Sequence, residues 1–201
     1  MKLTFTFFFI FLSIVFCENA NCQSIDKDST EVEFTPMNRT QLARYRRFIW
    51  DSLPIAVGWV NDFEGLFTNK QENALESVIE HFEKRTGIEI MIVTIDTNMV
   101  AKGDFKDFSY RLLRIWGIGK RLQENGIVIC ISSGYQILKV SCDFGIDKLM
   151  SESTTTRIEN KYFIPSYKKN KYYEGTYKGL DAIITQLSKK LKGLGQEDVA
   201  F

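Results

Sequence analysis

The chain of 201 residues has a single histidine and almost no excess of charge of either sign. A Ser-His-Asp hydrolase needs a histidine as its base. His81 stands in the middle of a predicted helix beside its apolar face, so we do not expect that class of enzyme. A Gly-rich phosphate loop of the Walker type is also absent. Because the formal net charge is only +1, the chain as a whole gives no reason to expect nucleic acid or an anionic membrane as a partner.

The chain also lacks an apolar run long enough to cross a bilayer. The run at residues 5–16 has about 12 residues, whereas a spanning helix needs roughly 20. Lys2 precedes this run and a polar stretch at residues 18–21 follows it, which is the pattern of a secretory signal peptide. We therefore predict a signal peptide at residues 1–22, export to the periplasm or the medium, and a mature chain without a transmembrane segment.

Cysteine is scarce, and export would remove half of it. Cys17 and Cys22 lie in the predicted signal segment, and the residues before them fit a lipobox poorly, so a lipid anchor is not the favoured form. Cys130 and Cys142 remain, and an oxidising compartment would allow them to pair. If residues 133–134 form a hairpin turn, however, the two thiols lie on opposite faces of the ribbon. We therefore predict two buried free thiols.

The hydrophobic pattern predicts one α/β domain. With 44% hydrophobic residues, a chain of this length can bury one sizeable core. Amphipathic helices with capping signals alternate with apolar strands, which predicts an α/β/α sandwich with a mixed central sheet flanked by helices. The expected helices cover residues 68–86, 104–116, 154–163 and 172–191, the second-last of them ending before Pro165, and the expected strands cover residues 88–95, 127–132 and 135–142.

The domain is expected at residues 56–192, with a leader before it and a frayed tail at 193–201. Residues 23–55 are polar and have little periodicity, so they are interpreted as an extended leader. Within them, residues 44–50 interleave arginines with aromatic side chains, and this segment could bind phosphate backbones or lipid head groups. We favour instead a short helix or arm whose aromatic side chains pack on the domain.

Several short motifs follow one another between about Val60 and Leu191. They are Val60-Asn61-Asp62, Thr86-Gly87-Ile88-Glu89-Ile90, Trp116-Gly117-Ile118-Gly119, Asn125-Gly126-Ile127 and Pro165 before the last helix. Their order and spacing resemble the TPM domain family, which is named after a thylakoid-lumen protein, a photosystem-associated protein and a levamisole-receptor modulator. The resemblance implies the same layered α/β/α fold.

The acidic positions depart from the family pattern. A typical member has a run close to Arg-Ile-Glu-Val-Gly-Tyr-Gly-Leu-Glu followed by Leu-Thr-Asp. Residues 139–147 of this chain are Lys-Val-Ser-Cys-Asp-Phe-Gly-Ile-Asp, and Met-Ser-Glu follows at residues 150–152. Relative to that pattern, one carboxylate is lost at Ser141, one is gained at Asp143, and the last is lengthened at Glu152.

Four acidic residues on loops at the strand ends are candidate metal ligands: Asp62, Asp143, Asp147 and Glu152. Carboxylates without histidine or paired cysteines suit a hard cation, so Ca²⁺ or Mg²⁺ is the metal to expect, and no organic cofactor is expected. The resemblance implies a divalent-ion site that involves the opening Asp and the later acidic residues. The structural alternative is that Asp62 and Glu152 cap helices while Asp143 and Asp147 are solvated turn residues.

Two classes of function follow. The first is a non-catalytic envelope accessory or quality-control module that binds envelope or membrane proteins, for which the lysine-rich residues 168–171 and 189–192 could supply a surface. The second is a divalent-cation-dependent phosphatase acting on phosphomonoesters, because some plant members of the family are described as acid phosphatases. The altered acidic positions favour the first class.

Overall fold

A computed structural model of the chain describes residues 36–119 and 124–194. The predicted signal peptide at 1–22, the first part of the leader and the tail from residue 195 lie outside the described residues. From Met37 onward, the described residues form one compact unit that contains every strand and both apolar clusters described below. Within the described part of the chain, no helix is long and apolar enough to cross a membrane.

A four-stranded sheet forms the centre of this unit, with its strands in the order β1-β2-β3-β4. The strands are β1 (Val60–Asp62), β2 (Glu89–Thr94), β3 (Gly126–Ser132) and β4 (Ile137–Cys142). The first three are parallel and β4 is antiparallel to β3, so the sheet is mixed as predicted. All seven residues of β3 are buried, because helices cover both faces of the sheet.

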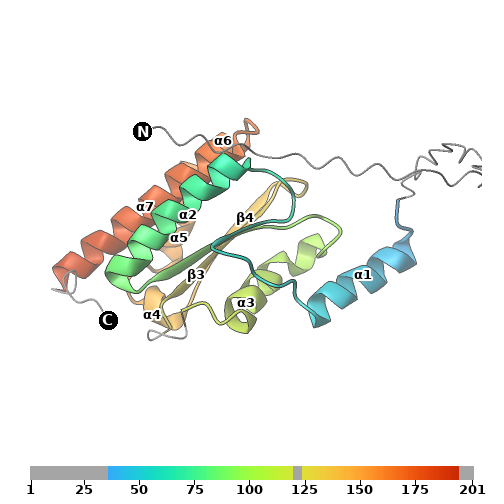
Figure 1. Cartoon of the computed structure of the whole chain (residues 1–201), viewed down its shortest axis with the longest axis horizontal. Coiled ribbons are helices and arrows are strands. Elements are labelled where there is room, and N and C mark those ends of the chain that lie inside the picture. Colours follow the sequence, from blue (N-terminus) through green and yellow to red (C-terminus); the bar gives the residue numbers. More distant parts are fainter. Residues whose placement is uncertain (1–35, 120–123, 195–201) are drawn as a thin grey trace, which may run out of the picture. The chain divides into compact units, whose positions relative to one another are not determined.

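Two helical layers cover the sheet, which gives the predicted α/β/α sandwich (Figure 1). One face carries α2 (Asn69–Thr86), α5 (Glu152–Ile158) and α7 (Tyr172–Gly193), and the other carries α3 (Phe105–Ile115) and α1 (Arg39–Asp51). Successive strand residues alternate between the two apolar clusters. The first cluster includes Leu75, Phe82, Ile90, Ile92, Ile129, Leu180 and Ile183, and the second includes Ile49, Met91, Val93, Phe105, Phe108 and Cys130.

The two crossovers between the parallel strands run over opposite faces. The connection from β1 to β2 contains α2, and the connection from β2 to β3 contains α3, after a short 3-10 turn at Lys102–Asp104. Both connections advance in the same direction across the sheet, so right-handed crossovers would place both helices on one face. One of the two is therefore left-handed, although about 98% of such connections are right-handed.

The ends of α2 lie where the sequence predicts them. Thr68 is its N-cap and forms a capping box with Gln71, each side chain accepting a hydrogen bond from the other residue's backbone N–H. Gly87 ends the helix in the left-handed conformation, with φ of 69°. Helices α3 and α7 also match their predicted ranges to within about two residues, the usual uncertainty of helix ends.

The segment expected as an extended leader contains helix α1. Asn38 and Gln41 form a capping box at its start, and Ile49 is buried against the domain. Arg46 anchors the helix, because its Nη2 donates hydrogen bonds to the Thr97 carbonyl at 2.7 Å and to the Tyr135 hydroxyl at 3.0 Å. The favoured alternative, a short helix packed on the domain, is confirmed. Its aromatic side chains pack there only in part.

The hairpin between β3 and β4 differs from the prediction. Four residues, 133–136, connect the strands, so Cys130 lies opposite Lys139 and Cys142 opposite Ile127. This register is shifted by two residues from that of a two-residue turn, and a shift of two keeps each side chain on its face. The thiols are therefore on opposite faces and free, with Cys142 only partly buried. Burial raises the pKa of both thiols, that of Cys142 to about 12.

The helix expected at 154–163 does not end before Pro165. Helix α5 continues through a π-helical segment, η3 (Glu159–Phe163), into α6 (Ile164–Tyr167). Pro165 lies in the first turn of α6, directly after this π-helical segment. The wide turn of η3 therefore lets the chain remain helical across a residue that usually ends a helix.

The close packing of α7 on η3 depends on a glycine. A methyl group at Gly179 would overlap the ring of the fully buried Phe163, so Gly179→Ala is expected to lower the free energy of unfolding by about 2 kcal/mol. Gly193→Ala in the same helix is the control. A Cβ there meets no heavy atom within 4 Å, so we expect no loss, or a gain of a few tenths of a kcal/mol. Urea denaturation measures both, and equal effects would contradict the packing argument.

Candidate functional site

Asp62 lies at the carboxyl end of β1 and orders the turn that follows. Its carboxylate accepts a hydrogen bond from the backbone N–H of Phe67 at 2.7 Å and another from the hydroxyl of Thr94 at the end of β2. The same hydroxyl accepts from the backbone N–H of Glu64. Asp62 does not cap α2, since Thr68 does so. Its role in the described structure is to join the ends of two neighbouring strands.

Glu64, which the sequence analysis did not single out, fixes the hairpin to the end of β1. Its carboxylate accepts hydrogen bonds from Ser133 N at 2.9 Å, from the Ser133 hydroxyl at 3.2 Å and from Gly134 N at 3.4 Å. Burial raises the pKa of Glu64, while the hydrogen bonds from Ser133 and Gly134 lower it. The partners are about 70 residues away in the sequence, so no local pattern could have identified this contact.

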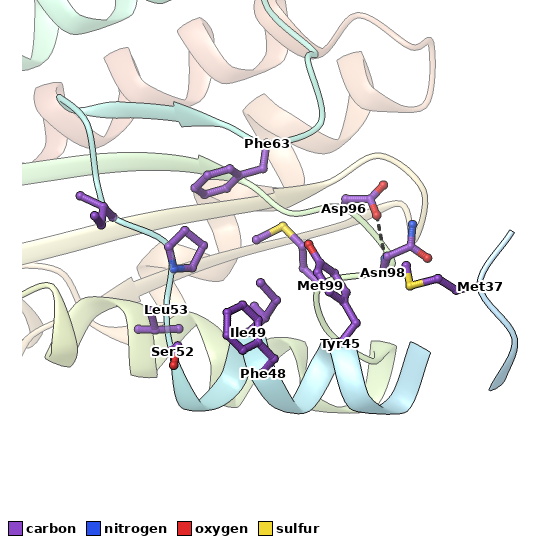
Figure 2. Close-up of a pocket in the computed structure, with 12 residues that line it drawn as sticks. Met37, Tyr45, Phe48, Ile49, Ser52, Leu53, Phe63, Asp96, Asn98 and Met99 are labelled. Carbon is purple, nitrogen blue, oxygen red and sulfur yellow. Dashed lines mark hydrogen bonds between the residues drawn. The ribbon is translucent and has the colours of Figure 1, made fainter. Parts of the chain in front are cut away.

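A groove of about 690 Å³ lies at the same edge of the sheet. Its walls come from α1, from Phe63 after β1 and from residues 96–99 after β2 (Figure 2). The connections after β1 and β2 leave the sheet toward opposite faces at this point, and such a position is where open α/β sheets commonly bind ligands. Here the groove is mostly apolar, with Ile49 and Met99 among its lining residues. Its described lining residues include no arginine or lysine and do include Asp96, so it is poorly suited to a phosphate group.

The other three predicted ligands lie on the side of the sheet formed by β4, far from β1. Asp143 caps helix α4 (Phe144–Asp147) by accepting a hydrogen bond from the backbone N–H of Phe144 at 3.0 Å. Partial desolvation, followed by the negative charges of Glu152 and Asp143, raises the pKa of Asp147. These three carboxylates therefore lie within electrostatic range of one another.

Asp62 is separated from Asp143 by most of the length of β3, and from Glu152 by the width of the sheet, because Glu152 contacts Lys139 on β4 whereas Asp62 ends β1. It is level with Thr94 and Ile131, whereas Asp143 follows Cys142, which pairs with Ile127. Four residues along β3 correspond to about 13 Å. The structure therefore brings Asp143, Asp147 and Glu152 together and leaves Asp62 at the other edge.

A lysine stands among the three clustered carboxylates. The Nζ of Lys139 in β4 lies 3.8 Å from Glu152 Oε1, and the Lys139 side chain is only 15% exposed. A second ammonium group, that of the exposed Lys106, lies 3.9 Å from the same oxygen. The charge of Lys139 lowers the pKa of both Asp147 and Glu159, so it acts on the whole cluster.

This donor set does not fit a divalent cation as it stands. A half-buried ammonium group already supplies positive charge to the carboxylates, and an ammonium cannot serve as a metal ligand. Among residues 36–119 and 124–194, no three or more His, Cys, Asp or Glu side chains are arranged to hold a metal ion. A metal would therefore have to move Lys139 aside before it could bind here.

The lost carboxylate at Ser141 also has a structural explanation. Ser141 is fully buried between β4 and α3, where its hydroxyl lies 2.5 Å from the hydroxyl of the equally buried Ser109. Ser109 in turn donates to the Lys106 carbonyl. A carboxylate in this position would be fully buried, and burial of a charge costs several kcal/mol unless the charge is paired. The serine pair therefore closes a position at which the family pattern has an acid.

Glu159 is a further acidic residue of this cluster that the sequence analysis missed. Its Oε1 accepts a hydrogen bond of 2.8 Å from the backbone N–H of Val140, on the outer edge of β4. Burial is the main cause that raises the pKa of Glu159, and this hydrogen bond and Lys139 oppose it. The residue belongs to η3, so its contact with β4 depends on the π-helical turn.

The sheet is mixed, has four strands and is covered by helices on both faces, so the domain is an α/β/α sandwich. Its acidic residues form two separate groups. Residues 60–186 match the family model described as the TPM domain, and the chain belongs to this family. No curated protein matches the chain.

Two solved structures have the same fold. The N-terminal domain of a protein from P. gingivalis is 22% identical, with a TM-score of 0.61 over 71% of this chain and 87% of that domain. The BA42 protein from the psychrophilic bacterium Bizionia argentinensis is 20% identical, with a TM-score of 0.55 over 64% of this chain and 86% of that protein. At these identities the likeness concerns the fold alone.

The buried charge of Glu159 makes a pH-dependent contribution to stability. Because its pKa is raised in the folded state, the folded chain binds a proton more tightly than the unfolded chain, and this term lowers the stability as the pH rises above about 4. Glu159→Gln keeps an acceptor for Val140 and removes the charge. Its stability relative to the unsubstituted chain should therefore increase from pH 4 to pH 7 in urea denaturation.

Glu159→Met is the matched control for the hydrogen bond. It leaves the buried N–H of Val140 without its partner, so we expect a loss of about 1 to 2 kcal/mol at both pH values. A stability difference between Glu159→Gln and the unsubstituted chain that stays constant with pH would contradict the assignment of the shift to Glu159.

Proposed function

We propose that this TPM-domain chain is an exported accessory or quality-control module of the cell envelope. In this proposal the ammonium group of Lys139 neutralises the acidic cluster. The protein acts by binding envelope or membrane proteins and not by metal-assisted catalysis. The observation that carries the proposal is the half-buried Lys139 ammonium group beside Glu152. It supplies the positive charge for which a metal site would use Ca²⁺ or Mg²⁺.

The hydrogen bonds that the other acidic residues accept within the domain support the same proposal. Asp62 and Glu64 accept hydrogen bonds from backbone N–H groups and hydroxyls of the domain, and Asp143 caps a helix. Carboxylates used in this way have fewer lone pairs left for a ligand. The apolar groove between α1 and the strand ends is equally unsuited to a phosphate group.

A groove beside the end of α7 offers a surface for an acidic partner segment. It has a volume of about 600 Å³ and combines three lysines with apolar side chains. Its lining residues include Lys148, Leu149, Lys189, Lys190 and Leu194. Positive charge around a partly apolar centre suits a protein segment that carries carboxylates beside apolar residues.

A divalent-cation-dependent phosphatase is the second candidate. The grouping of Asp143, Asp147 and Glu152 favours it. Desolvation and, after it, the charges of Glu152 and Asp143 raise the pKa of Asp147, and a bound cation would relieve the repulsion among these carboxylates. In this candidate Asp147 and Glu152 would hold the metal after Lys139 has moved away. The metal would supply a Lewis acid for the phosphate oxygens.

A metal titration of the melting temperature separates the two candidates. With Ca²⁺ or Mg²⁺ at about 1 mM, we expect no rise for the unsubstituted chain. We expect a rise of about 3 °C for Lys139→Met, whose cluster has lost its cation. Lys106→Met is the matched control, because it removes an exposed ammonium group at a similar distance from Glu152. It should respond like the unsubstituted chain. A rise in the unsubstituted chain that Asp147→Asn abolishes would contradict the proposal.

Hydrolysis of p-nitrophenyl phosphate tests the second candidate directly. We expect no metal-dependent hydrolysis above the buffer rate. Hydrolysis that requires the metal and is lost in Asp147→Asn, with the variant still folded by its melting curve, would establish the phosphatase. Hydrolysis that survives Asp147→Asn would come from another site or from a contaminant.

A further inference from the structure

Exposed apolar side chains concentrate on one face of the described structure. Of the eleven large apolar side chains that are exposed there, six lie between residues 37 and 63. The most exposed of all are Ile55, at 87%, and Val57, at 75%, on the extended segment that follows α1, and Phe48 on α1 is 61% exposed. Together with Met37, Tyr45 and Phe63, these residues form what we call the α1 face.

The shape of the α1 face combines a groove with protruding side chains. In Figure 2, Phe48 and Tyr45 project from α1 on one side and Phe63 faces them from the other, with Met99 between them. Ile55 stands at the rim, and Val57 lies beyond the groove lining. Burial of one apolar side chain is favourable by about 1.5 to 3 kcal/mol. Binding of a partner that covers several of these side chains at once would therefore be favourable.

Positive charge is concentrated on the same segment. Residues 37–57 contain four arginines and one aspartate, which gives 4 − 1 = +3, whereas the whole chain carries +1. The remainder of the chain therefore carries 1 − 3 = −2. The net charge of the whole chain does not reveal this uneven distribution. The composition therefore gave no reason to expect an anionic surface as a partner.

Three of the four arginines are exposed, but only Arg44 and Arg47 lie on the outer side of α1, because Arg39 precedes the anchored Arg46 by two helical turns and shares its side of the helix. Arg46 is held by Thr97 and Tyr135, whereas Arg39, Arg44 and Arg47 are exposed. Arg44 precedes Phe48 by four residues and so lies beside it on the helix surface. Arg47 pairs with Asp51 at 3.4 Å, but its side chain is 83% exposed and such a pair is weak in water.

From this coincidence of charge and apolar exposure we infer that the α1 face docks on the surface of an anionic lipid bilayer. Phe48, Ile55 and Val57 enter the boundary between head groups and acyl chains, and Arg44 and Arg47 contact lipid phosphates. Ile55 and Val57, the two most exposed of these side chains, stand at the rim of the groove and beyond it. A peptide lying in the groove would leave them uncovered, whereas a bilayer surface would cover them. Asp96 also lines the groove, so the anionic head groups would lie over α1 rather than over the groove floor.

Co-sedimentation with vesicles tests this inference. The experiment uses residues 37–201, which contain every described strand and both apolar clusters, so that the apolar run at 5–16 cannot itself bind lipid. The vesicles are phosphatidylcholine alone or phosphatidylcholine with about 30% phosphatidylglycerol. We expect binding to the anionic vesicles that is at least tenfold tighter than to the neutral ones and weakens when NaCl rises from about 0.05 M to about 0.5 M.

Two double variants probe the two components of the face, and each has a matched control. Phe48→Ser with Ile55→Ser, and Arg44→Gln with Arg47→Gln, should each weaken binding to the anionic vesicles at least tenfold. The controls change exposed residues elsewhere: Phe144→Ser with Tyr177→Ser, and Lys70→Gln with Arg85→Gln. They should bind like the unsubstituted fragment, and melting curves verify that all variants are folded.

Several outcomes would overturn the inference. One is the absence of binding to anionic vesicles, and another is binding that the α1-face variants and their controls weaken equally. If the fragment ignores vesicles but binds an acidic amphipathic peptide through Phe48 and Arg44, the face serves a protein partner instead. The metal and phosphatase measurements above do not depend on these results, so the accessory function stands or fails separately.

Discussion

The burial of both faces of β2 and β3 is the constraint on which the rest of the structure depends. Side chains of each strand enter two apolar clusters, so the sheet needs a helical layer on each side. The first crossover supplies α2 to one layer and the second supplies α3 to the other. Because α2 and α3 cover opposite faces, one of the two connections must be left-handed. A groove lies where the two connections diverge. Helix α1 completes the second layer and forms one wall of that groove.

The same sheet also decides which acidic residues meet. Residues after β1 and β2 collect at one edge, and those after β4 collect near the other, so four acids that look like one ligand set in the sequence become two groups. Within the second group, Lys139 on β4 and Glu159 on η3 complete an ion cluster without any external ligand. The family fold is kept, and the carboxylates beside β4 are engaged in ion pairs and hydrogen bonds within the domain.

Local signals predicted what local contacts determine. Thr68 and Gly87 mark both ends of α2 because caps act within one helical turn, and the apolar run before Asp96 predicts β2 because both of its faces are buried. The hairpin was predicted incorrectly because Ser133-Gly134 resembles a two-residue turn, whereas Gln136 adopts φ of 54° and lengthens the link. The contacts of Glu64 and Glu159 join distant segments, so a single sequence gives no signal for them.

The hydrogen bond from Val140 to Glu159 has a consequence for how this chain meets other proteins. β4 is an edge strand, and the free N–H groups of such an edge can pair with a strand of another chain. At Val140 that N–H is already taken by a side chain of the domain's own helix. Recognition through main-chain pairing is thereby obstructed at this edge, and so is uncontrolled growth of the sheet from one molecule to the next.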